Sequence, residues 1–527
     1  MPIEMHPTRW GDPARASALP EATRGLVELV FPVIDRTVGD DEAVAIPTSR
    51  LPDEVVAELY GIVGARHVLT DDASRRLRTR GKSTPDLLRA RAGDLSDAPD
   101  AVVRPGSHDE VQALLGVAAR HRVAVVPFGG GTSVVGGLVA RRDGYAGVIC
   151  LDLLRMDRLL DVDPVSMTAT LEPGVRGPQA EALLAEHGLT LGHFPQSFEH
   201  ASIGGFAATR SSGQSSAGYG RFDAMVVGLV VATPAGTVRL GHAPASAAGP
   251  DLRQVFLGSE GAYGVITAVA VRVRALPGER RYEGWHWPSF DAGVEAMRTL
   301  AQSQLLPSVL RLSDENETAL DLAHPDSIGS AGDGPSGGCL MIVGHEGTAA
   351  TVSARRTAVS AVLAGLGGTS VGEEPGRRWA AGRFDAPYLR DSMLDLGVLV
   401  ETLETAAHWS RLRSTYDVVS AALKASLGEP AMVLCHVSHV YETGASLYFT
   451  VAAPEGDDPL GRWTAAKRAA TQAIVGVDAT ITHHHAVGTD HRPWLEDEIG
   501  ALGVEVLRAV KHAVDPQGIL NPGVLVP

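Results

Sequence analysis

Three short loops rich in glycine and hydroxyl side chains constrain this chain more than any other feature. The first is Pro127-Phe128-Gly129-Gly130-Gly131-Thr132-Ser133, which follows a strand predicted at 123–128. The second runs from Pro195-Gln196-Ser197 through Ser202-Ile203-Gly204-Gly205 to Thr209, and the third is Gly258-Ser259-Glu260-Gly261-Ala262-Tyr263-Gly264-Val265-Ile266. Glycines let backbone N–H groups approach an anion closely, and the hydroxyls add further donors. Together the loops predict one extended pocket for a pyrophosphate and a flat ring.

Each loop taken alone has a simpler interpretation as a flexible turn, and two common phosphate-binding motifs are missing. Val134 stands where the dinucleotide fingerprint needs its third glycine. Gly81-Lys82-Ser83 is not a Walker loop, because its first required glycine would fall at Arg76. The prediction therefore depends on all three loops occurring between residues 127 and 266.

The chain around these loops has the pattern of a mixed α+β domain. A helix is predicted from Ser107 to about Arg120, because Ser107 and Glu110 form a capping-box pattern between two strand-like runs. The other elements expected here are a strand at 148–153, antiparallel strands within 161–175, a helix at 179–187, a hairpin over 225–240 and a long strand at 265–273.

The remaining segments have weaker patterns. Residues 1–95 are polar and turn-rich, with one apolar helix candidate at 26–34. Residues 278–470 are expected to hold two helical stretches, strand-like runs and a loose segment at 327–338. The last stretch is predicted to contain a strand ending in His483-His484-His485 and an amphipathic helix near 499–514.

Composition restricts the classes of partner that the protein can bind and the compartment in which it is expected. The 46 Lys and Arg against 62 Asp and Glu give a net charge of −16, which argues against nucleic-acid binding. Three cysteines do not make a disulfide framework, so a reducing, cytoplasmic setting is expected. The first residues lack the pattern of a signal peptide, and no apolar run approaches a membrane span. Contact with a membrane surface stays open.

Tyr441 and a group of histidines are the strongest candidates for acid–base chemistry. Tyr441 could simply be a packed aromatic side chain whose hydroxyl meets a carbonyl group. Near His436, His439 and His485, however, polar or cationic neighbours would lower the pKa of the phenol and make it a proton acceptor. On a strand, His483 and His485 would share one face, so at most two of the three consecutive histidines could bind one metal ion. We expect no metal, and instead expect partly protonated imidazoles that bind phosphate.

Two arginines are candidates for anion binding. Arg311 in Leu310-Arg311-Leu312 and Arg390 in Tyr388-Leu389-Arg390-Asp391 are by default partners in surface ion pairs. The functional alternative is bidentate capture of a phosphate or carboxylate. From the residues alone, Arg311 fits the structural interpretation better, and Arg390 stays undecided.

The order of the three loops resembles the FAD domain of flavoproteins of the vanillyl-alcohol-oxidase type. GGGTS, PQSFE with SIGG, and GSEGAYGVIT occur in family order over about residues 101–275. The resemblance implies a two-subdomain FAD-binding domain plus an α+β substrate cap, completed by a C-terminal segment. It implies FAD contacts by Pro127, Gly129, Gly130, Gly131, Thr132, Ser133, Pro195, Gln196, Ser197, Ser202, Gly205, Thr209, Ser259, Glu260, Gly261, Gly264 and Ile266. The first loop offers no His or Cys for a covalent tether, so non-covalent FAD is expected.

The second half of the chain resembles the alkyldihydroxyacetonephosphate synthases, which make ether lipid precursors. The matching blocks are SHVYETG, ITHHH, LRL and YLRD, with Arg9-Trp10-Gly11 near the start. The resemblance implies exchange of the acyl chain of acyl-dihydroxyacetone phosphate for a long-chain alcohol, through an adduct at flavin N5 and without net redox change. It implies an acid–base role for Tyr441, phosphate and flavin contacts for His483, His484 and His485, phosphate binding by Arg390 and a supporting role for Arg311. An apolar tunnel for the chains is expected in the cap.

The same resemblance gives domain boundaries and an alternative. We expect an N-terminal extension (1–95), an FAD domain (96–277), a cap (278–470) and a C-terminal segment (471–527), in a homodimer. The alternative is an FAD-linked D-2-hydroxy acid dehydrogenase or oxidase, because Ala262-Tyr263 replaces a common Thr-Leu pair and the segment 327–338 has no family counterpart. A flavin-binding scaffold with a decayed site is a third interpretation, which the intact Tyr441, histidines and arginines disfavour.

Overall fold

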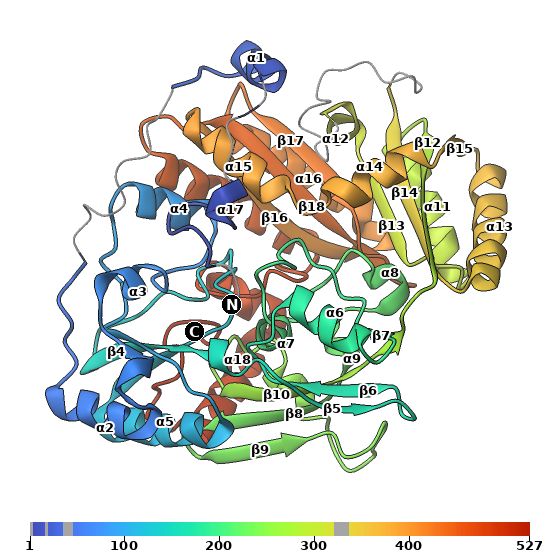
Figure 1. Cartoon of the computed structure of the whole chain (residues 1–527). Helices are drawn as coiled ribbons and strands as arrows, with labels where there is room; N and C mark the ends of the chain where they lie inside the picture. Colours follow the sequence, from blue (N-terminus) through green and yellow to red (C-terminus); the bar gives the residue numbers. More distant parts are fainter. Residues whose placement is uncertain (1–3, 16–18, 20, 35–45, 321–336) are drawn as a thin grey trace.

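The chain folds around two small sheets in its first half and one large sheet in its second half (Figure 1). The computed structural model describes residues 4–15, 19, 21–34, 46–320 and 337–527. Most of the loose segment expected at 327–338 lies outside the described residues. Among the helices that are described, none is both long enough and apolar enough to cross a membrane.

The first small sheet is the α/β unit that the sequence predicts. Its order is β1 (Val68–Leu69), β2 (Ala101–Val103), β4 (Gly147–Asp152) and β3 (Val123–Phe128), with β2, β4 and β3 parallel. α5 (His108–His121) links β2 to β3, and the Ser107 hydroxyl accepts the backbone N–H of Glu110 at its start. The Glu110 carboxylate in turn accepts the N–H of Gly106, so the predicted helix start is confirmed. β3 therefore delivers the first glycine loop at its carboxyl end.

The second small sheet is antiparallel and carries the other two loops. Its order is β5 (Leu159–Asp163), β6 (Thr168–Leu171), β10 (Val265–Arg272), β8 (Val226–Thr233) and β9 (Gly236–Leu240). The predicted hairpin is confirmed by the β8–β9 pairing. A small pair, β7 (Leu189–Thr190) with β11 (Arg274–Ala275), and the helices α6 (Gly177–Ala185), α7 (Ile203–Thr209), α8 (Ser216–Tyr219), α9 (Phe222–Met225) and α10 (Arg253–Phe256) complete this part.

The large sheet has seven antiparallel strands and lies within the residues that the sequence analysis assigns to the cap. Its order is β15 (Thr369–Gly372), β12 (Glu279–Trp287), β14 (Cys339–Gly347), β13 (Val309–Ser313), β17 (Met432–Val437), β18 (Gly444–Pro454) and β16 (Val398–His408). The expectation of two helical stretches here is wrong, because the described part holds seven helices. They are α11 (Phe290–Gln302), α12 (Glu315–Leu320), α13 (Ala349–Gly365), α14 (Glu374–Gly382), α15 (Ala386–Asp395), α16 (Trp409–Leu427) and α17 (Pro459–Gly476).

The two ends of the chain meet the body at the junction of these sheets (Figure 1). Residues before 96 form α1 (Glu21–Val30), α2 (Asp53–Val63), α3 (Asp72–Arg76) and α4 (Thr84–Arg91). The predicted C-terminal helix is α18 (Leu495–Val514), which kinks at Gly500. Beyond it Leu520 forms a parallel bridge to Val125, and Asp515 accepts the N–H groups of Ile519 and Leu520. The C-terminal segment therefore completes the first small sheet.

Candidate active site

A cavity of about 730 Å³ lies between the glycine loops and the large sheet. Sixteen of the seventeen residues predicted to contact FAD line it, the exception being Ser259. Ser259 is buried, and its hydroxyl donates to the carbonyl of Phe256. The three loops, which are far apart in sequence, thus form one surface, as the sequence predicts.

The first loop needs its glycines because other backbone packs directly against it. A Cβ atom at Gly129 would overlap the hydroxyl of Ser202, and one at Gly130 would overlap the carbonyl of His200. Gly131 has φ +70°, in the left-handed region that favours glycine. The loop is therefore held against the second loop with its backbone along the cavity.

Two buried side-chain amides in the cavity wall each have one polar atom that could bind a ligand. Gln196 Nε2 and Gln214 Oε1 have no hydrogen-bond partner among the residues that the structure describes. A buried polar atom without a partner is costly unless a ligand or water satisfies it. A donor and an acceptor beside a glycine-lined cradle fit the polar ring edge and the pyrophosphate of FAD.

Glu260 connects the third loop to the C-terminal segment. Its carboxylate accepts the backbone N–H groups of Val487 and Gly488 at 2.9–3.0 Å. Burial raises the pKa of Glu260 to about 7, although these hydrogen bonds oppose the shift. Its position explains how residues after 480 are brought to the cavity.

The three consecutive histidines form a turn, so the prediction of a strand is wrong. In the part of the chain that the structure describes, Thr480 bridges to Ala406 of β16, and His483–His485 follow as bends rather than as a strand. The carboxylate of Glu404, on β16, accepts the backbone N–H groups of all three histidines. Because the turn wraps around one carboxylate, the alternating faces expected from a strand do not apply.

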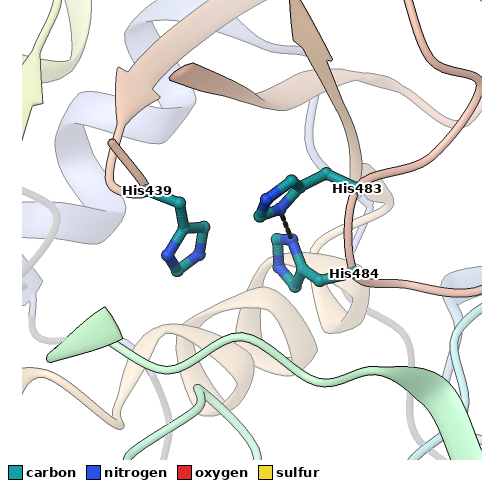
Figure 2. Close-up of side chains that lie close together, drawn as sticks. All are labelled: His439, His483 and His484. Carbon is teal, nitrogen blue, oxygen red and sulfur yellow. Dashed lines mark hydrogen bonds between the residues drawn. The ribbon is translucent and has the colours of Figure 1, made fainter. Parts of the chain in front are cut away.

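Tyr441 reaches this turn from the connection between β17 and β18. Its hydroxyl oxygen lies 2.6 Å from Nε2 of His483, and Nδ1 of His483 lies 2.9 Å from Nδ1 of His484. His439 stacks on His483 with ring centroids 5.1 Å apart (Figure 2). His484 and His485 line the cavity, and His483 and Tyr441 continue the line from His484. The arrangement is a line of groups that can exchange protons, with one end open to the cavity.

Burial gives these groups protonation states opposite to those expected from the sequence. It raises the pKa of Tyr441 to about 12, although Arg221 opposes the shift, so the phenol keeps its proton at neutral pH. Burial holds the pKa of His483 well below its usual value, lowers that of His484, and lowers that of His485 to about 3. The predictions of a lowered tyrosine pKa and partly protonated imidazoles are therefore both wrong in direction.

The two predicted arginines lie in the cavity wall, and each is anchored by the protein. Arg390 donates through Nη1 to the carbonyl of Lys82 at 2.7 Å, and through Nε and Nη2 to Asp391. A guanidinium has five N–H donors, so two remain for a ligand. Arg311 donates to Glu317 at 2.7 Å and lies 3.1 Å from Nδ1 of His436. Arg390 thus keeps the capacity for anion binding, and Arg311 also orients His436.

One arm of the cavity is apolar and reaches the surface at α1. Leu29 and Val30 line the cavity and are also exposed, at 82% and 44%. The deeper wall of this arm is formed by side chains from α1, α15 and the edge of the large sheet: Leu26, Val27, Leu389, Met393, Val400, Met432 and Ala452. An apolar channel open at one end suits a long alkyl chain.

Sequence reasoning missed two residues that organise the site. Glu404 is a buried carboxylate within a strand, and a charged residue at an inward position was the only available signal. Arg221, just before α9, donates to the carbonyl of His483 at 3.0 Å and pairs with Asp223 through two hydrogen bonds. Nothing in its local sequence marks it, because its partner is 262 residues away.

Comparisons with known proteins agree with this arrangement. Residues 99–241 match the family model of an FAD binding domain, and residues 276–525 match that of the C-terminal domain of FAD linked oxidases. The alkyldihydroxyacetonephosphate synthase of Dictyostelium discoideum is 34% identical over 501 residues, covering 91% of this chain and 82% of that protein. The same enzyme of Trypanosoma brucei brucei is 34% identical over 504 residues, with the same coverage. A solved alkyldihydroxyacetonephosphate synthase superposes with a TM-score of 0.83 at 29% identity, over 98% of each chain.

Proposed function

The chain belongs to the alkyldihydroxyacetonephosphate synthase family, and from this membership we propose the reaction that its own site carries out. It is an FAD-dependent enzyme of ether lipid precursor synthesis. It exchanges the fatty acyl group of acyl-dihydroxyacetone phosphate for a long-chain fatty alcohol, with no net redox change.

The observation that carries this proposal is the composition of one cavity. Its wall combines the glycine loops, anchored arginines, the histidine turn and an apolar arm that opens at α1. The substrate needs these same parts, because it joins a phosphate, a reactive carbon and a long chain. A small hydroxy acid has no long chain that could occupy the apolar arm.

FAD would be held by the three loops, with Gln196 and Gln214 satisfied by its polar edge. When bound, FAD supplies a ring nitrogen that can hold C1 of the substrate during the exchange. We propose that binding is non-covalent, since the loop Phe128–Ser133 has no His or Cys for a tether. The flavin should therefore be released when the protein is denatured with acid.

The charged end of the substrate would meet the arginines and the histidine turn. Arg390 has two free N–H donors for phosphate, and the Lys82 and Asp391 contacts fix its orientation. Arg311 supports the wall by holding His436. His484 and His485, neutral at physiological pH, would donate N–H groups to phosphate oxygens or to the cofactor rather than act as cations.

Tyr441 would handle the proton of the incoming alcohol. Because its pKa is high, it holds a proton at rest and must give that proton away as it accepts another. Its neighbour His483, a neutral imidazole at 2.6 Å, is the group that can receive it. Tyr441 and His483 thus act as an acid–base pair.

The apolar arm would hold the acyl and alkyl chains, and its exposed end supports the proposal of contact with a membrane surface. Leu29 and Val30 are 82% and 44% exposed at that end, where a lipid substrate would enter. We propose a cytoplasmic homodimer. The exposed side chains Ile499, Leu502 and Val506 of α18 are a face that a second copy could cover.

Anaerobic mixing tests the reaction against its alternative. With acyl-dihydroxyacetone phosphate and hexadecanol, the protein should form the alkyl product while the flavin stays oxidised. Bleaching of the flavin by D-lactate or glycolate, with no alkyl product, would instead identify a 2-hydroxy acid dehydrogenase.

A further inference from the structure

A hydrogen-bonded line of three side chains lies beside a buried carboxylate that the proposed reaction does not yet use. The line runs from Tyr441 through His483 to His484, and the carboxylate of Glu404 lies next to His484. We propose that Glu404 is the positioning residue of a proton relay in which Tyr441 passes its proton to His483, and His483 passes its own to His484. This inference rests on the proposed function, because it concerns the proton that the exchange releases.

The relay answers a need of the chemistry. In the exchange, the alcohol O–H bond and the C1–O bond to the acyl group break, and a C1–O bond to the alkyl group forms. The acyl group leaves as a carboxylate, so one proton is released per turnover. A site in which every nearby imidazole is buried needs a defined path for that proton.

The carboxylate of Glu404 fixes the turn through four hydrogen bonds. Oε1 accepts from the hydroxyl of Thr482 at 2.6 Å and from the N–H groups of His484 and His485 at 3.1 and 2.9 Å. Oε2 accepts from the N–H of His483 at 2.6 Å. The Glu404 side chain is fully shielded from solvent, so these contacts are not weakened by competing water. They fix the backbone from which both imidazoles project.

The relay assigns one direction to each of these hydrogen bonds. A protonated Tyr441 donates to Nε2 of His483, so that a neutral His483 carries its proton on Nδ1 and donates it to Nδ1 of His484. During turnover Tyr441 gains a proton on its oxygen as its own moves to His483, and the Nδ1 proton of His483 moves to His484. One positive charge then rests on His484, which lines the cavity and can release the proton there.

Glu404 compensates that charge. Its Oε2 lies 3.6 Å from Nδ1 of His484, close enough for attraction and too far to take the proton. The three histidines hold the pKa of Glu404 far below its usual range, so it stays a carboxylate throughout. In return, Glu404 raises the pKa of His483 and His484 against the larger effect of burial.

Among the groups that face His483 and His484, Glu404 is the anion that can compensate a positive charge on them. From the other packed elements these groups are Arg221 and Asp223 at α9, His193, His436, His439 and Tyr448, with His485 on the turn itself. Asp223 is already paired with Arg221. Removing the charge of Glu404 would therefore leave the protonated pair without compensation.

The side chains of His439, His483 and His484 also have nitrogen atoms within 4.8 Å of one another, a spacing that could hold a metal ion (Figure 2). Both ring nitrogens of His483 are already engaged, one by Tyr441 and one by His484. A cation would have to break one of these hydrogen bonds. The geometry therefore favours proton transfer within the cluster.

Nitrogen NMR of ¹⁵N-labelled histidine in the FAD-loaded protein tests the relay without any substrate. The relay predicts a neutral His483 protonated on Nδ1 and a neutral His484 protonated on Nε2 at pH 7.5, assigned with the variants His483→Asn and His484→Asn. A His483 protonated on Nε2 would donate to Tyr441 instead, and this result would overturn the proposal.

Kinetics of Glu404→Gln then tests the positioning role. Glutamine keeps one acceptor oxygen and removes the charge, so kcat should fall by about tenfold or more with KM little changed. The acidic limb of the kcat profile should move to lower pH by about one unit or more, because the pair loses its counter-charge. Glu404→Asp, which keeps the charge, should recover part of kcat and keep the wild-type limb. An unshifted limb in Glu404→Gln would contradict the relay.

Glu283→Gln is the matched control. Glu283 is a buried glutamate of the same sheet, on β12, held by Trp285 and Arg356 away from the cavity. It should keep the wild-type pH profile. If the wild-type protein forms no alkyl product but shows the predicted histidine tautomers, the proposed function fails, whereas the hydrogen-bond directions assigned to Tyr441, His483 and His484 stand. If it forms the product with the opposite tautomers, the reverse holds.

Discussion

The hydroxyl oxygen of Tyr441 lies 2.6 Å from Nε2 of His483, although 42 residues separate the two in the chain. The contact joins the connection between β17 and β18 to the turn that follows α17. It combines a phenol that keeps its proton with an imidazole that stays neutral. Tyr441 and His483 are therefore the acid–base pair of the proposed mechanism.

Tyr441→Phe should lower kcat for alkyl transfer by about 10²- to 10⁴-fold, because it removes the group that exchanges a proton with His483. The FAD content, measured by flavin absorbance, should stay at the wild-type level, since the three glycine loops, and not Tyr441, are expected to hold FAD. Tyr145→Phe is the control, because it loses one hydrogen bond to Gly518 far from the site. A Tyr441→Phe enzyme with near-normal kcat would remove Tyr441 from the mechanism.

Gly130→Ala should lose most of its bound FAD. A Cβ atom at this position overlaps the carbonyl of His200, so the first loop must move away from the second. Gly61→Ala is the matched control, since Gly61 lies in α2 with nothing within 4 Å of the added atom. The control should retain wild-type FAD, measured as the flavin-to-protein absorbance ratio after gel filtration. Equal ratios in both variants would show that the loop does not hold the cofactor.

Ala452→Phe should shift the preference toward shorter alcohols. Ala452 lies on β18 opposite Val400 and Met432, all three in the apolar arm, so a phenyl ring would fill part of the channel. The ratio of kcat/KM for octanol to that for hexadecanol should rise by about tenfold. Thr450→Val, which leaves the volume of a neighbouring wall residue nearly unchanged, should keep the wild-type ratio. An unchanged ratio in Ala452→Phe would place the chain elsewhere.

Stability should fall as the pH drops from 7 to 5. Burial lowers the pKa of His193 and His485 to about 3 and that of His200 and His345 to about 4. The unfolded chain protonates these side chains near their ordinary pKa of about 6.5, so below that pH it binds more protons than the folded state. Each such histidine then costs about 2 kcal/mol of unfolding free energy at pH 5. Urea midpoints at the two pH values check the sign, and a higher midpoint at pH 5 would contradict it.

Features that neighbouring residues specify could be predicted from the sequence, whereas features that depend on distant residues could not. The glycine loops and the start of α5 were predictable, because a turn or a cap is specified by neighbouring residues such as Ser107 and Glu110. The histidine turn was not, because its shape depends on Glu404, nearly eighty residues earlier in the chain. Protonation was misjudged for the same reason, since burial of Tyr441 and His485 is a property of the folded whole.

Alkyl transfer from ¹⁸O-labelled hexadecanol tests the proposed exchange of the acyl group for the alkyl group. We expect that the ¹⁸O label is found in the ether oxygen of the alkyl product, that one unlabelled fatty acid is released per ether formed, and that the flavin stays oxidised throughout. Mass spectrometry of both products gives the answer. Label recovered only in an ester, or no ether together with a reduced flavin, would contradict the account.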